Sequence, residues 1–189
     1  MEQPTPQQIL RKKKFGEPVA PDEDVQEHRH VVAVLLENTI GALNRVVNLF
    51  SARGFNLESV SVGETDDPEI ARLTLTVTGN DRIIAQVIRQ LEGLVDTLEV
   101  SDLTADDHVE RELCLLKVRY TTKSRAEVMD VSEIFRGKVV DVTPATMTFE
   151  VTGPTTKINA FVGMMRPHGI VEMARSGRVA MRRAMFYED

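Results

Sequence analysis

The sequence is poor in cysteine and in aromatic residues. It holds one cysteine, Cys114, no tryptophan and 5% aromatic residues among 189. One cysteine excludes a disulfide within the chain. Because Cys114 lies in the apolar run LCLLKV with no evident charged activator beside it, we expect a reduced, buried thiol. A reduced thiol is typical of a cytoplasmic protein.

Long apolar runs and an excess of positive charge are missing as well. No apolar stretch approaches the ~20 residues that a membrane-spanning helix needs. The formal net charge is -6, which argues against a binder of nucleic acid or of membrane surfaces, since both require a basic face. The first residues lack the apolar core of a signal peptide. We therefore expect neither nucleic acid nor a membrane as a partner.

Motifs for catalysis and for metal binding are also absent. The sequence has no Gly-rich phosphate-binding motif and no supported Ser-His-Asp or Cys-His arrangement. None of the four histidines has ligand spacing with a cysteine or an acid pair, so we expect surface or loop histidines and no metal site. These are His28, His30, His108 and His168. The sequence thus predicts no catalytic residue.

The composition is otherwise that of a globular protein, with 42% hydrophobic and 28% charged residues. Residues 1–29 are rich in proline, glutamine and charge, and they predict a disordered tail. The rest divides at the polar stretch TADDH into two predicted domains, 30–104 and 105–189.

Apolar periodicity predicts the same order of elements in both domains. In the first, we expect strand 30–36, helix 41–53, strands 55–62 and 72–77, a helix capped by Asn80 or Asp81, and strand 94–101. In the second, we expect strand 113–120, a helix opened by the capping box Ser124–Glu127, strands 138–143 and 147–152, a helix from 155 with Met164 on its apolar face, and strand 170–175. A β-α-β-β-α-β order predicts an antiparallel sheet with two helices on one face, and the other face open to solvent or a partner.

This order occurs in proteins of several functions, and the residues narrow the choice. RNA-reading modules stack bases on aromatic residues of the central strands, whereas the strand around residue 75 carries threonine and arginine. Small acyl phosphatases use a Gly-rich anion loop with an arginine. Here the corresponding loop offers Glu37, Asn38 and Thr39, which is a poor cradle for phosphate.

The same loop is suited to a small zwitterion. Backbone N–H groups of Gly41, Ala42 and Leu43 open a helix and can receive a carboxylate, and Gly41 has no Cβ to block its approach. The amides of Asn38 and Asn56, which we expect near the same helix end, can accept from an ammonium group. Spacing alone favours a structural alternative, in which these residues only shape the turn and the end of the helix.

Several segments, in order, resemble the small regulatory subunit of acetolactate synthase, whose first domain is an ACT domain. They are LLENTIGALNRVVNLFSARGFNLESVSV, TDDPEIARLTL, QLEGLVDTLEVSDLT, HVERELCLLKV, EIFRGKVVDVTPATMTFEVTG and VEMARSGRVAMRR. The resemblance spans about residues 30–183. It implies an α+β protein of two tandem ferredoxin-like units, an ACT domain and a smaller ACT-like domain.

The resemblance also implies a function. The chain would have no cofactor of its own and would activate a separate catalytic large subunit, which uses thiamine diphosphate, magnesium and FAD. It would confer feedback inhibition by branched-chain amino acids, mainly valine, through an effector site between two ACT domains of a homodimer. The effector-binding residues of the family fall on Asn38, Gly41 and Asn56.

One departure and two alternatives accompany this resemblance. Ile40 stands where many ACT domains carry proline or a small polar residue, so the sequence leaves open whether feedback inhibition is retained. A stand-alone amino-acid sensor with another client enzyme is the first alternative. A small hydrolase on a ferredoxin-like fold is the second, and the missing anion loop argues against it.

Overall fold

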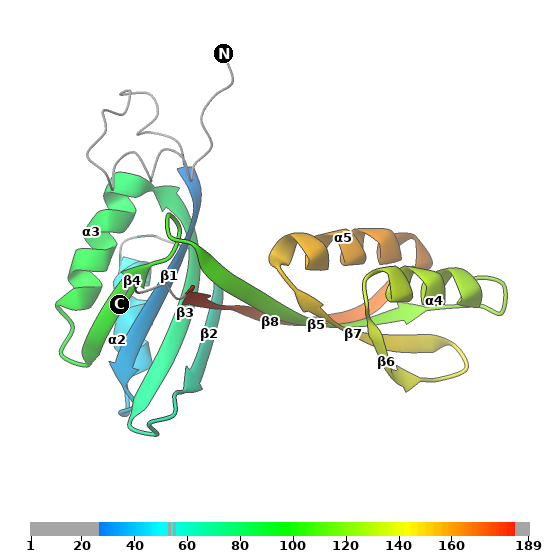
Figure 1. Ribbon diagram of the computed structural model, residues 1–189, viewed down its shortest axis with the longest axis horizontal. Helices are drawn as coiled ribbons and strands as arrows, with labels where there is room; N and C mark the ends of the chain where they lie inside the picture. The colour runs from blue at the N-terminus through cyan, green and yellow to red at the C-terminus, as the bar shows by residue number, and fades with distance from the viewer. Residues whose placement is uncertain (1–26, 53, 55, 184–189) are drawn as a thin grey trace, which may run out of the picture. The chain divides into compact units, whose positions relative to one another are not determined.

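The computed structural model describes residues 27–52, 54 and 56–183, and the chain forms two compact units (Figure 1). The first unit comprises Met1–Val109 and Ala180–Asp189, and the second comprises Glu110–Val179. The division differs from the predicted one, because the end of the chain returns to the first unit. Of the expected tail, residues 1–26 lie outside the described residues, whereas residues 27–29 already belong to a strand.

The first unit follows the predicted order. Its elements are β1 (Glu27–Glu37), α2 (Ala42–Ala52), β2 (Leu57–Glu64), β3 (Ile70–Asn80), α3 (Asp81–Glu92) and β4 (Thr97–Asp102). The sheet order is β2-β3-β1-β4, and all the neighbouring strands are antiparallel. As expected, Asn80 caps α3, since its side chain accepts a hydrogen bond of 2.8 Å from the Arg82 amide.

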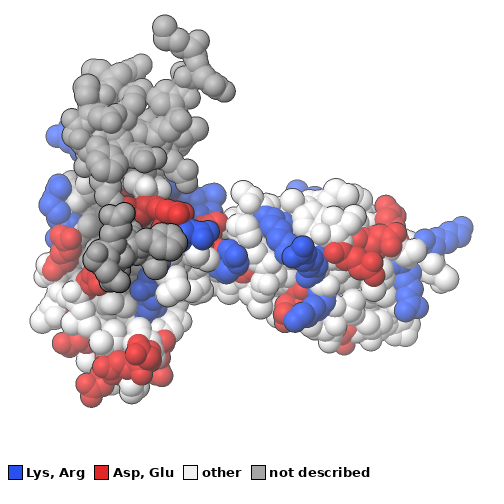
Figure 2. Space-filling model, viewed as in Figure 1, with Lys and Arg blue, Asp and Glu red and all other residues white. Residues whose placement is uncertain are grey.

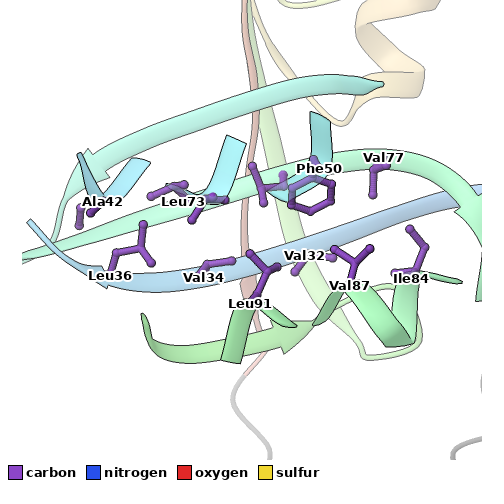
Figure 3. Packing of buried hydrophobic residues seen from close by; sticks show 13 residues of the cluster. Val32, Val34, Leu36, Ala42, Phe50, Leu73, Val77, Ile84, Val87 and Leu91 are labelled. Carbon is purple, nitrogen blue, oxygen red and sulfur yellow. The ribbon is translucent and has the colours of Figure 1, made fainter. Parts of the chain in front are cut away.

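Helices α2 and α3 cover one face of this sheet (Figure 3). Alternate residues of β1 and β3 point into the space beneath the helices because side chains of a strand alternate between its faces. Phe50 of α2 and Leu91 of α3 close that core from the helical side, each at most 1% exposed. The core therefore fixes α2, and with it the loop that precedes α2.

The opposite face of the first sheet is partly covered by the segment around Ala180. Ala180 packs against Val31, Ala33 and Leu103 in a small cluster of buried residues. The carbonyl of Ala180 accepts a hydrogen bond of 3.1 Å from Arg72 Nη2. This face was expected to meet solvent or a partner, and part of it instead meets a segment of the same chain.

The second unit repeats the topology. Its elements are β5 (His108–Arg119), α4 (Arg125–Ile134), β6 (Lys138–Val142), β7 (Thr146–Gly153), α5 (Thr155–Met165), the 3₁₀ helix η2 (Arg166–His168) and β8 (Ile170–Arg182), with β5 beginning and β8 ending in the first unit. The order β6-β7-β5-β8 matches that of the first sheet. The predicted fold class, two tandem α+β units of ferredoxin-like order, is confirmed.

Three details of the second unit test the sequence predictions. Cys114 is buried as expected, and burial raises the pKa of its thiol. The predicted capping box is wrong: Ser124 has helical backbone angles and makes no capping bond, because its Oγ accepts from the Thr121 amide at 2.9 Å. Met164, assigned to the apolar face of α5, is instead 54% exposed.

Within the described ranges, no helix is both long enough and apolar enough to cross a membrane.

Candidate functional site

The loop between β1 and α2 leaves backbone donors free at the start of the helix. Gly41 has a φ of 90°, a backbone conformation that only glycine adopts without strain. The Ala42 amide donates to the Thr39 carbonyl at 3.2 Å. Among the described residues, the Gly41 and Leu43 amides donate to no acceptor, so the N-terminus of α2 retains free donors at the positive end of its dipole.

Asn38 is held against the loop that joins β2 to β3. Its backbone amide donates to the Glu69 carbonyl at 2.6 Å, and its Nδ2 donates to the Pro68 carbonyl at 2.9 Å. The side-chain amide is thus oriented with its nitrogen toward this loop, leaving the oxygen as the group that can accept from a ligand. The side chain of Ile40 is fully exposed at this loop.

Acidic side chains surround the same end of the first sheet. Glu64 Oε1 lies 3.4 Å from Asn38 Nδ2, and the loop GETDDPE adds Asp66, Asp67 and Glu69. Figure 2 shows the acidic side chains gathered at one end of the first unit. A ligand with an ammonium group is favoured by this charge, whereas a phosphate is disfavoured.

An ion pair fixes the loop from the other side, and sequence reasoning missed it. Asp96, in the turn before β4, binds the Arg45 guanidinium through both carboxylate oxygens, with Arg45 Nη2 2.7 Å from Oδ1. Thr39 Oγ1 donates to Asp96 Oδ1 at 3.4 Å, and the Asp96 carbonyl accepts from the Glu37 amide at 2.8 Å. These contacts connect the end of β1, the loop and the first turns of α2 to one residue.

The electrostatics of Asp96 follow from this pairing. The hydrogen bonds from Arg45 hold the pKa of the Asp96 carboxyl below its usual range, although burial acts in the opposite direction. The side chain is 9% exposed while that of Arg45 is 42% exposed. Asp96 therefore stays ionised at neutral pH and acts as a fixed anchor for the guanidinium.

Asn56 lies far from Asn38 within one chain. We expected both near the same helix end, and the structure shows that this is wrong. Asn38 follows the end of β1 and precedes α2, whereas Asn56 follows α2 and precedes β2. Since β1 and β2 are both antiparallel to β3, they run in the same direction, and the two asparagines lie at opposite ends of the sheet. Only two chains together could bring them to one ligand.

Two of the histidines are also placed wrongly by the sequence prediction. His28 and His30 are not surface or loop residues: both lie in β1 and are 9% and 1% exposed. His108 lies in β5 and His168 in η2, both half-buried. The alternation of β1 accounts for the burial of His28 and His30, since they continue the face that carries Val32.

Comparison with known proteins settles the family. A model described as "AHAS small subunit-like ACT domain" matches residues 32–99, and one described as "Small subunit of acetolactate synthase" matches residues 111–184. The chain is 54% identical over 166 residues to the acetolactate synthase small subunit of Aquifex aeolicus, covering 87% of this chain and 86% of that one. The chain belongs to the acetolactate synthase small-subunit family.

Other members of the small-subunit family extend the match. The isozyme 3 small subunit of Escherichia coli is 46% identical over 156 residues, which cover 82% of this chain and 96% of that one. The crystal structure of the Thermotoga maritima acetolactate synthase small subunit gives a TM-score of 0.76 at 38% identity, covering 84% of this chain and 99% of that chain. The resemblance found in the sequence is therefore confirmed for both units.

Proposed function

We propose that this chain is a regulatory subunit of acetolactate synthase that raises the activity of a separate catalytic large subunit. The observation that supports this most is that the family match spans both units. A stand-alone amino-acid sensor would need only the first. In this proposal the chain contributes no catalytic residue, and the thiamine diphosphate, magnesium and FAD belong to the large subunit, in the cytoplasm.

The proposed effector is a branched-chain amino acid, mainly valine. Its carboxylate binds the free amides of Gly41 and Leu43, and that of Ala42 in exchange for the Thr39 carbonyl, and its ammonium group binds the Asn38 side-chain oxygen. Asn56 completes the site from the partner chain of an ACT homodimer, which accounts for the separation of the two asparagines within one chain. The free N–H groups at the helix start and the acidic surroundings of Asn38 support a zwitterionic ligand.

Inhibition requires that valine discriminate between two states of the holoenzyme. A ligand shifts such a balance only by its difference in affinity for the two states. We propose that valine favours an arrangement of the ACT dimer in which the activating contact with the large subunit is lost.

Reconstitution tests the regulatory role. The full chain alone is expected to form no acetolactate from pyruvate, and to stimulate its cognate large subunit severalfold when the two are mixed. Valine is expected to reverse that stimulation. A full chain that neither binds nor stimulates the large subunit contradicts the proposal.

Single-residue variants test the effector site. Loss of one hydrogen bond to a charged group costs about 1.5–3 kcal/mol, so Asn38→Ala and Asn56→Ala should each weaken valine binding roughly 10-fold or more in calorimetry. Asn44→Ala is the matched control, because Asn44 is an exposed asparagine of α2 outside the proposed site. Unchanged binding in both variants would leave Asn38 and Asn56 with structural roles only.

A further inference from the structure

A buried group of two histidines and one aspartate lies at the opposite end of the first sheet from Asn38. His28 and His30 are two residues apart in β1, so they share the face that packs against the helices. Asp81 is the first residue of α3 and is 7% exposed. The pairing of Glu27 with Asn80 brings the start of β1 against the start of α3 (Figure 1).

The potential ligand atoms of these residues converge. Asp81 Oδ1 lies 2.5 Å from His28 Nε2 and 3.4 Å from His30 Nε2, and the three atoms that the group can offer all lie within 4.8 Å of one another. The imidazole centroids are 4.3 Å apart. Neither ring nitrogen of His30 makes a hydrogen bond within the described part of the chain, although the ring is 1% exposed.

In the second unit, Glu112 occupies the position that corresponds to His28 in the first. His28 pairs with Gly79 across β1 and β3, and Glu112 pairs with Gly153 across β5 and β7. In each case a helix begins two residues after the glycine, at Asp81 or at Thr155.

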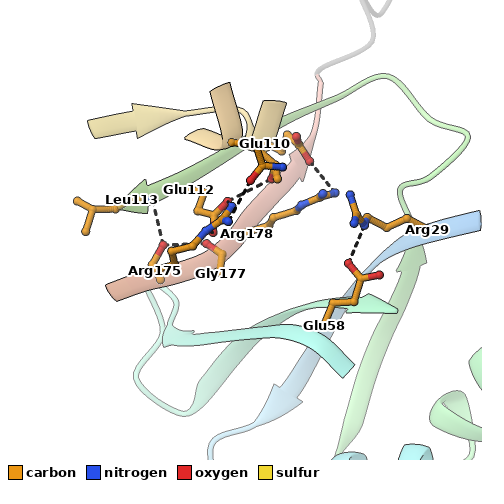
Figure 4. Close-up of polar contacts among 11 residues, drawn as sticks. Arg29, Glu58, Glu110, Glu112, Leu113, Arg175, Gly177 and Arg178 are labelled. Carbon is orange, nitrogen blue, oxygen red and sulfur yellow. Dashed lines mark hydrogen bonds and ion pairs between the residues drawn. The ribbon is translucent and has the colours of Figure 1, made fainter. Parts of the chain in front are cut away.

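In the second unit, the buried carboxylate of Glu112 is neutralised by a cation. Arg175 binds both carboxylate oxygens of Glu112 at 2.7 Å, and Thr155 Oγ1 donates to one of them at 3.2 Å (Figure 4). At the corresponding position of the first unit, two imidazoles lie beside Asp81. Imidazoles are uncharged ligands for a metal when deprotonated, whereas a guanidinium is not a ligand.

We propose that His28, His30 and Asp81 form a binding site for one divalent transition-metal ion of the zinc type. The ligands are Nε2 of each histidine and Oδ1 of Asp81, and a fourth position is open to water. Two imidazoles and a carboxylate suit zinc and its neighbours in the first row better than magnesium or calcium, which prefer oxygen ligands. Binding separates Asp81 from His28 by about 1 Å, since tetrahedral ligands at ~2.0 Å from zinc lie ~3.3 Å apart.

Asp102 supplies the supporting group such a site requires. Its Oδ2 lies 3.9 Å from His30 Nδ1, on the side of the ring away from the proposed ion. Its Oδ1 accepts from the Thr104 amide at 2.9 Å and from Thr104 Oγ1 at 2.5 Å. A carboxylate hydrogen-bonded to the second ring nitrogen orients a ligating imidazole and selects its tautomer, and Asp102 would take this role once the distance to His30 shortens. The ion would join the start of β1 to the start of α3.

The test uses the full chain prepared without a polyhistidine tag and stripped of metal with a chelator. We expect it to bind one Zn²⁺ per chain with a Kd of about 1 µM or below in a competition titration with a chromophoric chelator, and to unfold at a higher temperature with Zn²⁺ present. Binding weaker than about 100 µM, or a stoichiometry that rises steadily with added Zn²⁺, means an adventitious ion only and overturns the proposal.

Variants assign the ligands. Loss of a group that supports a metal ligand typically weakens metal binding by about 10- to 100-fold, and we expect Asp102→Asn to weaken Zn²⁺ binding by about this factor. His28→Gln and Asp81→Asn remove ligands and should each weaken Zn²⁺ binding by more. His108→Gln is the matched control, as a half-buried histidine of the same unit outside the group, and should bind Zn²⁺ like the parent.

Circular dichroism without metal shows whether each variant folds. Because His30 is the most buried member, at 1% exposed against 9% for His28, the His28 variant is the decisive one. A folded His28→Gln variant that binds Zn²⁺ as tightly as His108→Gln overturns the assignment.

Discussion

The two units share one topology and differ in the polar groups that are built into it. In the first unit the connection from strand to helix contains Gly41 with a left-handed backbone and free amide donors. In the second, the equivalent connection contains Ser124, which bonds back to Thr121. Thus one helix start remains available to a ligand, while the other is occupied by its own turn. A repeated fold therefore does not imply a repeated site.

Excising the second unit should produce the largest effect. The Arg183 amide donates to the Asp107 carbonyl at 3.0 Å, so a short turn can join Val109 to Ala180 and leave the cluster around Ala180 intact. We expect such a protein to bind valine like the full chain and to lose all stimulation of the large subunit. Calorimetry and the reconstitution assay measure the two properties separately. Retained stimulation would mean that the first unit alone activates the enzyme.

Removing Arg175 should destabilise the second unit next most strongly. Glu112 is 5% exposed and Arg175 is 29% exposed, so Arg175→Met leaves a buried carboxylate without its cation. Because the arginine is partly solvated, we expect about 2–3 kcal/mol rather than the full cost of breaking a buried pair. Denaturant unfolding measures the loss. Arg166→Met, at an exposed arginine, is the control and should change the stability little.

Glycine substitutions should act in opposite directions in the two units. Gly41→Ala forces a side chain into a left-handed backbone, which costs about 1–2 kcal/mol, and its Cβ would lie 3.3 Å from Arg45 Nη1. Gly163 lies within α5, where an added Cβ would meet no heavy atom within 4 Å. Gly163→Ala should therefore stabilise the protein by about 0.5–1 kcal/mol. Equal signs of the two changes in unfolding free energy would contradict the assigned backbone geometry.

Acid should weaken both units through one carboxylate in each, with the smallest effect of the four. Arg45 holds the pKa of Asp96 below its usual value, and contacts with Arg175 and Thr155 outweigh burial to lower that of Glu112. A lowered folded-state pKa stabilises the fold above the unfolded-state pKa, near 4, and that contribution disappears as pH falls through the folded value. Asp96→Asn and Glu112→Gln should each make the loss of stability below about pH 4 shallower in thermal melts. A steeper loss in either variant would contradict the pairing.

Local periodicity was sufficient to predict the order of elements and most of the face that each helix buries. The apolar spacing of α2 and the alternation of β3 gave the fold class, and the glycine before α2 pointed to the open helix start. Pairs distant in sequence could not be predicted in this way. Arg45 and Asp96 are 51 residues apart, and Asp81 meets His28 only because of the register between β1 and β3. The predicted cap at Ser124 is wrong because the Ser124 hydroxyl accepts a hydrogen bond from the Thr121 amide instead.

The return of Ala180 to the first sheet has a consequence for the order of folding during synthesis. Val31 and Ala33 are made early, but the residue that covers them lies 71 positions after Val109, the last residue of the first segment of that unit. At typical elongation rates of 5–20 residues per second, this interval is roughly 4–14 s. During that time the nascent first unit exposes a patch that the finished protein buries. A chaperone or a second nascent chain that recognises apolar strands would encounter this patch only on the ribosome.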